Sequence, residues 1–478
     1  MSGPIRLPRP RLLTDDQLTR ICETGMEILA RHGLMVMHAP ALEAAGRAGL
    51  RVQGDRVFPE RSDIGAFLAE ERAGGRPAPT EAGEKTDLTL NISGYASHIL
   101  DLDTDELLPC TEPLLIESCK LIDSLAAESV VGGAPGYPTE VHHLLQPLLK
   151  YKIQAQHCRH GGEPVDHMWP PTLPYVMEMA EALGHPIRSL PVYVVSPLAI
   201  GAESLESVMS AAHKLERVSA SNMPSVGATT PIRIGHALAL GLAEVAGAAM
   251  VLRAITGLPV GWSVWSMAFD MRGMSLALGA PEQRLFMWAS EELNAFCRGR
   301  EPGIPWGWGS MYTEAKTPGV QAAAEKMAGA MVYALLGARD LDGGGELKNI
   351  FSPEQLVIDC EIRDYVARLT AGVNGDCDPE TCFAEIVAGI GHGFMGVDST
   401  LDSYRDVYWF PRLFERRPVA AWIEAKGPDL RARAKSIARE FIAKYDYALA
   451  DDISKEVNRI YADATKHLAV WPDDRRMA

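Results

Sequence analysis

VYVVS (residues 192–196), RVSASN (217–222) and PVGWSV (259–264) are three short segments that are rich in valine and serine. A segment of helical length follows each of them, at residues 203–216, 232–256 and 281–298. Short β-rich runs that alternate with helices indicate strands joined by helical crossovers, and such crossovers place the strands side by side and parallel. These three units therefore predict an α/β fold with a parallel sheet.

The same rhythm continues on both sides of these units. Further strand-like segments lie at residues 129–133, 153–157, 303–306, 338–342 and, less clearly, 393–397. Helices are expected near residues 139–152, 173–184, 319–336 and 353–370. Eight strand–helix units most simply close into a (β/α)₈ barrel, which we expect in residues 113–478 together with C-terminal helices. A doubly wound open sheet is the alternative, but no GxGxxG turn follows the first strand.

Residues 1–112 have a different pattern and are expected to form an N-terminal appendage. Thr14-Asp-Asp-Gln17 is a capping box, and Gly33 closes the helix that it begins. Shorter helices are expected at residues 40–48 and 62–72. The alternating stretch from 97 to 108 turns at Asp103-Thr-Asp105 and predicts a β-hairpin.

Composition excludes several classes of protein. At 47% hydrophobic and 23% charged residues, the chain is typical of globular proteins. Its formal net charge of −16 argues against nucleic acid and anionic membranes as partners. No apolar run is long enough for a membrane span, and the first thirteen residues lack the apolar core of a signal peptide, so a cytoplasmic location is expected. The eight cysteines are scattered without a CxxC pair and are interpreted as reduced thiols.

The Ala-rich helix expected at residues 232–256 is apolar on all sides apart from Glu244. A helix of this kind is buried on more than one face. We expect it inside the protein or at a subunit interface. Burial at a subunit interface would agree with the homo-oligomer that we expect.

In a barrel of this type the chemistry lies at the C-terminal ends of the strands. The polar and aromatic residues at those positions are His157, His160, Asn222, Trp262, Trp265, Asp270, Trp306, Trp308, Tyr312, Glu314, Lys316, Asp342 and Glu346.

Four of the tryptophans lie in two of these segments. PWGWGSMY (305–312) contains Trp306 and Trp308 beside glycines, with Tyr312 close behind, and Trp262 and Trp265 lie at the end of the preceding strand. Aromatic faces bind quaternary ammonium groups, because the ring quadrupole attracts a cation that has no N–H to donate. These rings, with Trp262 or Trp265, predict an aromatic cage; ordinary packing of the rings is the alternative.

His157 and His160 leave three interpretations open: a metal ligand, a contact to substrate or partner, and a structural hydrogen bond. No obvious carboxylate completes a metal-ligand set, and no metal site is predicted. Gly343-Gly-Gly345 lacks the Gly-Lys-Ser/Thr ending of a P-loop, so a turn of close backbone approach is expected there.

An ordered set of motifs resembles the trimethylamine methyltransferase family. It comprises NMPSVGATTP (222–231), DMRG (270–273), GAPE (279–282), TEAKTPGVQ (313–321), DGGGE (342–346) and LVIDCE (356–361), and it covers nearly the whole chain. The resemblance implies a (β/α)₈ barrel that moves a methyl group from a methylated amine to the cobalt of a separate corrinoid protein. Only standard residues occur here, which resembles the non-pyrrolysine branch and implies a quaternary amine such as glycine betaine.

The resemblance implies roles for several of the residues above. Asp270 and Glu314 would complement the substrate cation, while Lys316, Arg272, His157 or His160 would hold a substrate carboxylate. Structural pairing of the two acids with Arg272 and Lys316 is the alternative. The chain lacks the Asp-x-His-x-x-Gly pattern that ligates cobalamin, so the corrinoid is expected on a partner protein and no cofactor on this chain.

Two other functions remain open from the sequence. One is a metal-dependent lyase or hydrolase that uses His157, His160 and Asp342. The other is a non-catalytic betaine-binding protein on the same scaffold.

Overall fold

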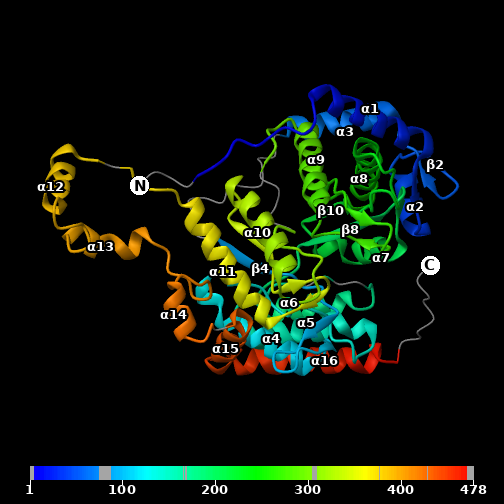
Figure 1. Ribbon diagram of the computed structural model, residues 1–478. Coiled ribbons are helices and arrows are strands. Elements are labelled where there is room, and N and C mark those ends of the chain that lie inside the picture. Colours follow the sequence, from blue (N-terminus) through cyan, green and yellow to red (C-terminus); the bar gives the residue numbers. More distant parts are fainter. Residues whose placement is uncertain are drawn as a thin grey trace.

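The computed structural model describes residues 5–74, 88–164, 166, 169–303, 309–375, 377–427 and 429–470. Their secondary structure alternates between strands and helices, and the fold is α/β. Figure 1 shows two regions: one is built around β8, β10 and α8, and the other around β4, α4 and α11.

The first region contains the largest sheet. Its strands run in the order β11-β10-β8-β9-β1-β3-β2. The parallel part consists of β8 (Ser189–Val195), β10 (Arg217–Asn222) and β11 (Val260–Ser263), which confirms the three strands expected from the sequence. The other strands are β9 (Ala199–Ile200), β1 (Leu34–Val36), β3 (Arg56–Val57) and β2 (Val52–Gln53).

The parallel strands of this sheet have one face covered by helices and one face open. Val192, Val218 and Val260 lie in a core shared with α1 (Asp15–His32) and α8 (Ile234–Thr256). On the other face, the register places Tyr193, Ser221 and Ser263 in one row across the sheet. Tyr193 is 44% exposed, so this face is accessible to a ligand.

The second region contains three parallel strands in the order β14-β4-β7. They are β14 (Asp340–Gly344), β4 (Thr89–Ile92) and β7 (Val130–Val131), and their register aligns Asp342 with Asn91 and Asn91 with Val131. The strands at 129–133 and 338–342 are thereby confirmed. Residues 89–92 were expected in the appendage, but β4 lies at the centre of this sheet.

Two other expected strands are wrong. Residues 153–157 are the last part of α5 (Gln146–His157), because Pro147 begins a helix and Leu149 and Ile153 continue its buried face. Residues 393–397 lie between α12 (Pro379–Gly389) and α13 (Asp398–Val407) and contain no strand. The segment expected at 303–306 lies outside the described residues except for Gly303. Over the described ranges the strands form four separate sheets and no closed barrel.

Residues of the expected appendage join both regions. The capping box is present, since Thr14 accepts from the backbone of Gln17 and the Gln17 side chain accepts from that of Thr14. Helices α2 (Ala39–Arg47) and α3 (Arg61–Ala73) are also present, and β5 (His98–Leu100) and β6 (Leu107–Pro109) form the expected hairpin. Helix α1 packs on α8 and strand β1 pairs with β9, so both contact residues beyond position 112. A domain boundary at residue 112 stays a prediction.

Helix α8 is long and apolar enough to cross a membrane, but most of its apolar window is buried inside the protein. Buried glycines let neighbours approach: a Cβ at Gly247 would lie 2.8 Å from Leu29 of α1. This helix therefore has the burial of a core helix.

The remaining helices cover the two regions. They are α4 (Glu112–Ser124), α6 (Leu173–Ala182), α7 (Ala202–Ala211), α9 (Pro281–Cys297), α10 (Val320–Leu335), α11 (Pro353–Thr370), α14 (Val419–Glu424), α15 (Leu430–Ala443) and α16 (Asp451–Leu468). Short strands complete two hairpins, β12 (Phe269–Asp270) with β13 (Ser275–Leu276) and β15 (Glu346–Leu347) with β16 (Ile350–Phe351).

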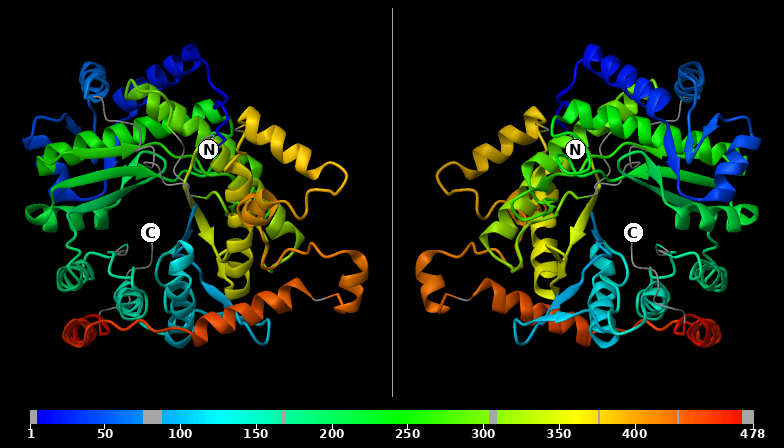
Figure 2. Two further views of the ribbon diagram at one scale, coloured as in Figure 1. Left: turned by 90° about the vertical axis from the view of Figure 1, so that its left-hand side faces the viewer. Right: turned by 90° about the vertical axis from the view of Figure 1, so that its right-hand side faces the viewer.

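Helices α12 and α13 form an arm that projects away from both regions (Figures 1 and 2). Large apolar side chains on the arm are exposed, among them Phe383, Met395 and Leu401. An apolar surface of this kind is typical of an interaction site.

Candidate active site

The C-terminal ends of β14 and β4 bring together two acids, of which Glu346 is buried and Asp342 is partly exposed. Asp342 lies on β14, Glu346 follows it, and Ser93 follows β4. The side chain of Tyr312 hydrogen-bonds both Ser93 and Asp342, and Ser93 hydrogen-bonds Glu346. Three predicted site residues, Tyr312, Asp342 and Glu346, thus lie in one cluster.

Burial makes both carboxyl groups harder to ionise. The pKa of Glu346 is raised to about 7, chiefly by burial and with a contribution from the negative charge of Asp342, against the Ser93 hydrogen bond and the charge of Lys326. Burial also raises the pKa of Asp342, against the hydrogen bonds that it accepts from Gly309 and Tyr312. One oxygen of Glu346, Oε2, has no hydrogen-bond partner among the described residues. The cluster therefore has an unsatisfied acid that a cation would stabilise.

A buried ion pair shapes the loop between these two acids. Lys326 Nζ lies 2.8 Å from Asp359 Oδ2 and donates to the carbonyl of Gly343 at 2.8 Å. The backbone N–H of Gly345 donates to the same carboxylate oxygen. Gly343 has a φ of 103°, and a Cβ there would lie 2.6 Å from Tyr312 Cδ1. The expected turn of close backbone approach is confirmed.

A second cluster lies at the C-terminal ends of β4, β7 and β8. Its members are Tyr95, Tyr137, Lys150, Asp166 and Tyr193. Tyr95 donates a hydrogen bond to Asp166, and the Lys150 ammonium lies 4.2 Å from the centroid of the Tyr137 ring.

The charge of Asp166 acts on all the other members of the tyrosine cluster. Burial raises the pKa of Tyr193 to about 12, and Asp166 adds to that shift. Burial and Asp166 likewise raise the pKa values of Tyr95 and Tyr137. Burial lowers the pKa of Lys150 to about 8, while Asp166 opposes the change. Tyr95, Tyr137, Lys150, Asp166 and Tyr193 are not among the site residues expected from the sequence.

The two acids predicted to be catalytic both have cationic partners within the protein. Arg272 forms a two-pronged pair with Asp270, at 2.7 and 3.0 Å, and lowers the pKa of this carboxyl to about 2. Glu314 pairs with Lys348 at 2.7 Å, whereas Lys316 donates to the Glu314 backbone carbonyl. The expected structural pair of Asp270 with Arg272 is therefore present. Glu314 also has a structural partner, but this partner is Lys348 and not Lys316.

Asn222 joins β10 to α8 from a fully buried position. Its Nδ2 donates to Glu244 at 2.7 Å, and its Oδ1 accepts from the backbone of Trp265 at 3.0 Å. Trp265 itself donates through Nε1 to Ser263, which lies on the open face of the sheet. The structure thus places Trp265 beside the open face and Asn222 behind it.

Trp262 is directed into the helix layer, which is a correction to the predicted cage. It is 3% exposed, donates through Nε1 to Glu71 and has its ring under the Arg298 guanidinium at 4.4 Å. Strand alternation explains this, since Val260, Trp262 and Val264 share the buried face. Trp306 and Trp308 lie outside the described residues.

The two histidines lie away from the acid cluster. His157 is at the end of α5 beside Tyr445, where burial lowers its pKa, and His160 is exposed. The described residues contain no group of three or more His, Cys, Asp or Glu that could hold a metal ion. His157, His160 and Asp342 are therefore not brought together as a metal site.

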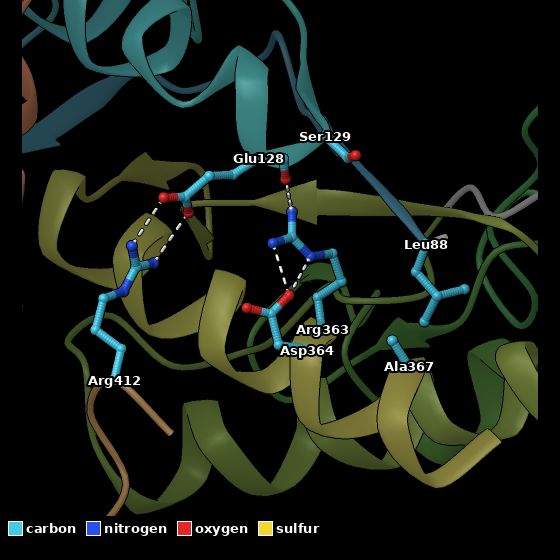
Figure 3. A pocket seen from close by; sticks show the side chains of 7 residues that line it. All are labelled: Leu88, Glu128, Ser129, Arg363, Asp364, Ala367 and Arg412. Atoms are coloured by element: carbon cyan, nitrogen blue, oxygen red, sulfur yellow. Dashed lines mark hydrogen bonds and ion pairs between the residues drawn. The ribbon is translucent and has the colours of Figure 1, made fainter. Parts of the chain in front are cut away.

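A surface hollow of about 420 Å³ lies at the opposite ends of β4 and β7. Its lining includes Leu88 and Ser129, which directly precede these strands. Figure 3 shows the Arg412 guanidinium facing the Glu128 carboxylate and Arg363 facing both Asp364 and the Glu128 backbone. Because these charges already pair with one another, the hollow does not add to the candidate site.

Comparison with known proteins gives a consistent result. The model of the family described as trimethylamine methyltransferase (MTTB) matches residues 177–467. The chain is 26% identical to a glycine betaine methyltransferase of Desulfitobacterium hafniense, over 97% of this chain and 98% of that protein. It is 28% identical to a trimethylamine methyltransferase of Methanosarcina mazei, over 68% of this chain and 66% of that protein.

Two further similarities cover different lengths. A proline betaine:corrinoid methyltransferase of Eubacterium limosum is 28% identical over 52% of both chains. The crystal structure of a monomethylamine methyltransferase of Methanosarcina barkeri aligns with 94% of this chain and 90% of that chain, at a TM-score of 0.43 and 11% identity.

Proposed function

The chain belongs to the trimethylamine methyltransferase family, and we propose that it moves a methyl group from a betaine-type quaternary amine to the cobalt of a corrinoid on a partner protein. Two of the similar proteins are named for betaine substrates, and one of these names includes a corrinoid. The match to the glycine betaine methyltransferase extends over nearly the whole of both chains, which supports a shared reaction.

The tyrosine cluster is the observation that carries this proposal. Tyr95 is 57% and Tyr193 44% exposed, so both side chains are accessible at the strand ends, although burial of their hydroxyls raises their pKa values. Asp166 lies among them and supplies a negative charge. Rings with a nearby carboxylate bind a quaternary ammonium, which has no N–H for directed hydrogen bonds.

The reaction needs binding and orientation more than acid–base chemistry. Attack of reduced cobalt on an N-methyl group displaces a neutral tertiary amine, so no proton has to be supplied to the leaving group. The cationic charge disappears as the methyl leaves, and groups that bind this charge stabilise the substrate at least as much as the transition state. We therefore assign the rings and acids to holding the substrate in line with the acceptor.

The arrangement of the strands supports a barrel with an open mouth. We propose that β7-β4-β14 and β8-β10-β11 are six strands of a (β/α)₈ barrel, because each set is parallel and a helix follows each strand, in four of the six after one or two further short strands. Both clusters lie at the C-terminal ends of these strands, the face that carries the chemistry in such barrels. The corrinoid partner would dock on this face.

Three tryptophans of the predicted cage remain part of this proposal: Trp265, Trp306 and Trp308. Trp265 is beside the open face of the sheet, and Tyr312 contacts Asp342 of the acid cluster. Trp306 and Trp308 precede Gly309, whose N–H lies 3.4 Å from Asp342 Oδ2. We propose that these rings and the tyrosine cluster wall the same cavity.

The arm supports the predicted homo-oligomer. We propose that α12 and α13 pack against a second copy of the chain, because exposed Phe383, Met395 and Leu401 would then be buried. Light scattering should show an oligomer for the wild-type chain and a smaller species when all three residues are changed to Ser. A cytoplasmic location stays a prediction.

Methyl transfer can be tested directly. The purified chain is mixed with chemically reduced cob(I)alamin, or with a reduced corrinoid protein, and with glycine betaine, proline betaine, choline or trimethylamine. We expect methylcobalamin, seen by absorbance, and the demethylated amine, seen by mass spectrometry, with at least one betaine. Binding of betaines without methyl transfer to either acceptor would instead indicate a non-catalytic binding protein.

A further inference from the structure

Lys150 is a buried lysine at the C-terminal ends of two neighbouring parallel strands. Its side chain reaches from α5 and donates a hydrogen bond of 2.7 Å to the carbonyl of Gly94, which follows β4. The ammonium also lies 4.2 Å from the ring centroid of Tyr137, which follows β7, and 5.6 Å from that of Tyr95. Only 6% of the residue is exposed.

Among the described residues the ammonium of Lys150 has no carboxylate partner, in contrast to Lys326, which is also buried. Lys326 forms an ion pair of 2.8 Å with Asp359, as a structural lysine in a protein interior should. Lys150 forms no ion pair within the described ranges, and the nearby Asp166 accepts instead from Tyr95. One hydrogen bond and two ring contacts compensate a buried charge only in part.

The backbone around Lys150 is built to admit the ammonium. A Cβ at Gly94 would lie 2.7 Å from Lys150 Nζ, so a side chain there would displace the end of the lysine. The adjacent residue Ser93 hydrogen-bonds Glu346 of the acid cluster. The consecutive residues Ser93 and Gly94 thus contact an acid, Glu346, and a base, Lys150, respectively.

We propose that Lys150 binds the carboxylate of a zwitterionic betaine and thereby selects betaines over quaternary amines that have no carboxylate. This inference rests on the proposed function. A carboxylate beside Lys150 completes the missing ion pair, while the ammonium end of the same molecule faces the tyrosine rings and the acids. A cation without a carboxylate gains nothing from Lys150 and is repelled by it.

The ligand itself provides one test on the wild-type protein. Glycine betaine and its methyl ester have the same ammonium, but only glycine betaine has the carboxylate charge. Calorimetric titration should show the ester binding about 10- to 100-fold more weakly, which is the value of a charge-assisted hydrogen bond. Equal affinities for the acid and the ester would overturn the proposal.

Substitution provides the second test. Lys150→Met should weaken the binding of glycine betaine about 10- to 100-fold and leave that of tetramethylammonium unchanged or tighter. Lys152→Met is the matched control, because Lys152 lies on the same helix but pairs with Glu112 and lies over Tyr461. A folded Lys150→Met variant that loses affinity equally for both ligands would show a structural role and refute the selection.

The outcomes for the two proposals can be separated. If the wild-type chain demethylates quaternary amines but does not distinguish glycine betaine from its ester, only the role of Lys150 is refuted. If it binds none of these amines and forms no methylcobalamin, the proposed function fails as well. Where Lys150→Met does not fold, as judged by circular dichroism, the ester experiment decides.

Discussion

The carboxylate of Glu244, in the middle of α8, accepts a hydrogen bond of 2.7 Å from Nδ2 of Asn222 at the end of β10. The same carboxylate accepts from the Ser196 hydroxyl at 2.9 Å and from the Leu198 backbone at 3.1 Å. Burial raises the pKa of Glu244, and these three donors oppose the change. The pair fixes a strand end against the core helix and thereby positions the loop that contains Trp265.

Asn222→Ala should destabilise the protein without acting on ligand binding directly. The substitution leaves one oxygen of the buried Glu244 without its closest donor, which costs about 1 to 3 kcal/mol. Urea denaturation should show the loss. Ser221→Ala is the control on the preceding residue, whose side chain lies on the open face of the sheet. An Asn222→Ala variant as stable as the Ser221→Ala variant would contradict this account.

Glu346 should make stability depend on pH in a defined direction. Its pKa is raised from 4.5 to about 7, so the folded state holds a proton that the unfolded state releases between these values. Stability therefore falls as pH rises through this window, by up to about 3 kcal/mol from this residue. Glu346→Gln should remove that loss, which is measured as the difference in unfolding free energy from wild type at pH 5 and pH 8. An equal difference at both pH values would contradict the prediction.

Gly343→Ala should disturb the loop between the two acids of the cluster. The residue has a φ of 103°, and its Cβ would meet Tyr312 and the Met311 backbone at 2.6 and 3.0 Å. We expect a loss of stability of about 1 to 3 kcal/mol, because both the backbone and the contact are strained. Gly375→Ala is the matched control, since nothing lies within 4 Å of a Cβ there. Thermal unfolding of both variants tests the prediction.

Much of the sheet could be predicted because its strands are short, rich in valine and followed by helices. The sequence predicts a strand at residues 153–157 because a short apolar run does not distinguish a strand from a buried helix. The helix is indicated by the four-residue spacing between the buried residues Leu149 and Ile153. Strand β4 was missed because its four residues pair with β14, about 250 residues away, and lie next to a true hairpin.

The acids of the acid cluster could be predicted as site residues, since Asp342 lies near the end of a strand and Glu346 follows that strand. Trp262 could have been excluded by strand alternation, which puts it on the face of Val260 and Val264. Lys150 and Asp166 could not be found in this way. Their contacts depend on how α5 and the segment after it pack against β4, and no local pattern of residues encodes that packing.

Betaine binding should weaken in alkaline solution because Lys150 loses its proton. Burial lowers its pKa to about 8, so the ammonium is present below this value and is lost as pH rises through it. The groups that face Lys150 are Asp166, Tyr95, Tyr137, Cys110 and Cys119. Burial raises the pKa values of Tyr95, Tyr137 and Cys110, that of Cys110 to about 12, so none of these three loses a proton near pH 8. The dissociation constant of glycine betaine should rise by up to about tenfold per pH unit above 8, while that of tetramethylammonium should not. A flat profile for glycine betaine in titrations from pH 6.5 to 9.5 would argue against the assignment.

Tyr193 should contribute to ammonium binding through its ring and not through its hydroxyl. The ring lies on the open face of β8, in register with Ser221, and the charge of Asp166 reaches it. Tyr193→Phe keeps the π face and should bind tetramethylammonium nearly as well as wild type. Tyr193→Leu removes it and should weaken binding by about 0.5 to 2 kcal/mol, or roughly 2- to 30-fold.

The matched control for Tyr193 is Tyr175→Leu, because Tyr175 is a partly exposed tyrosine on α6 that hydrogen-bonds His467. That substitution should leave ammonium affinity unchanged. Calorimetry on the three variants and wild type measures the four affinities under one condition. If Tyr193→Phe and Tyr193→Leu bind alike, the ring supplies only apolar area, because a cation–π contact requires the aromatic face that leucine lacks. The ammonium would then have to be held by the acids and by Trp265, and Trp265→Leu would be the variant that loses affinity.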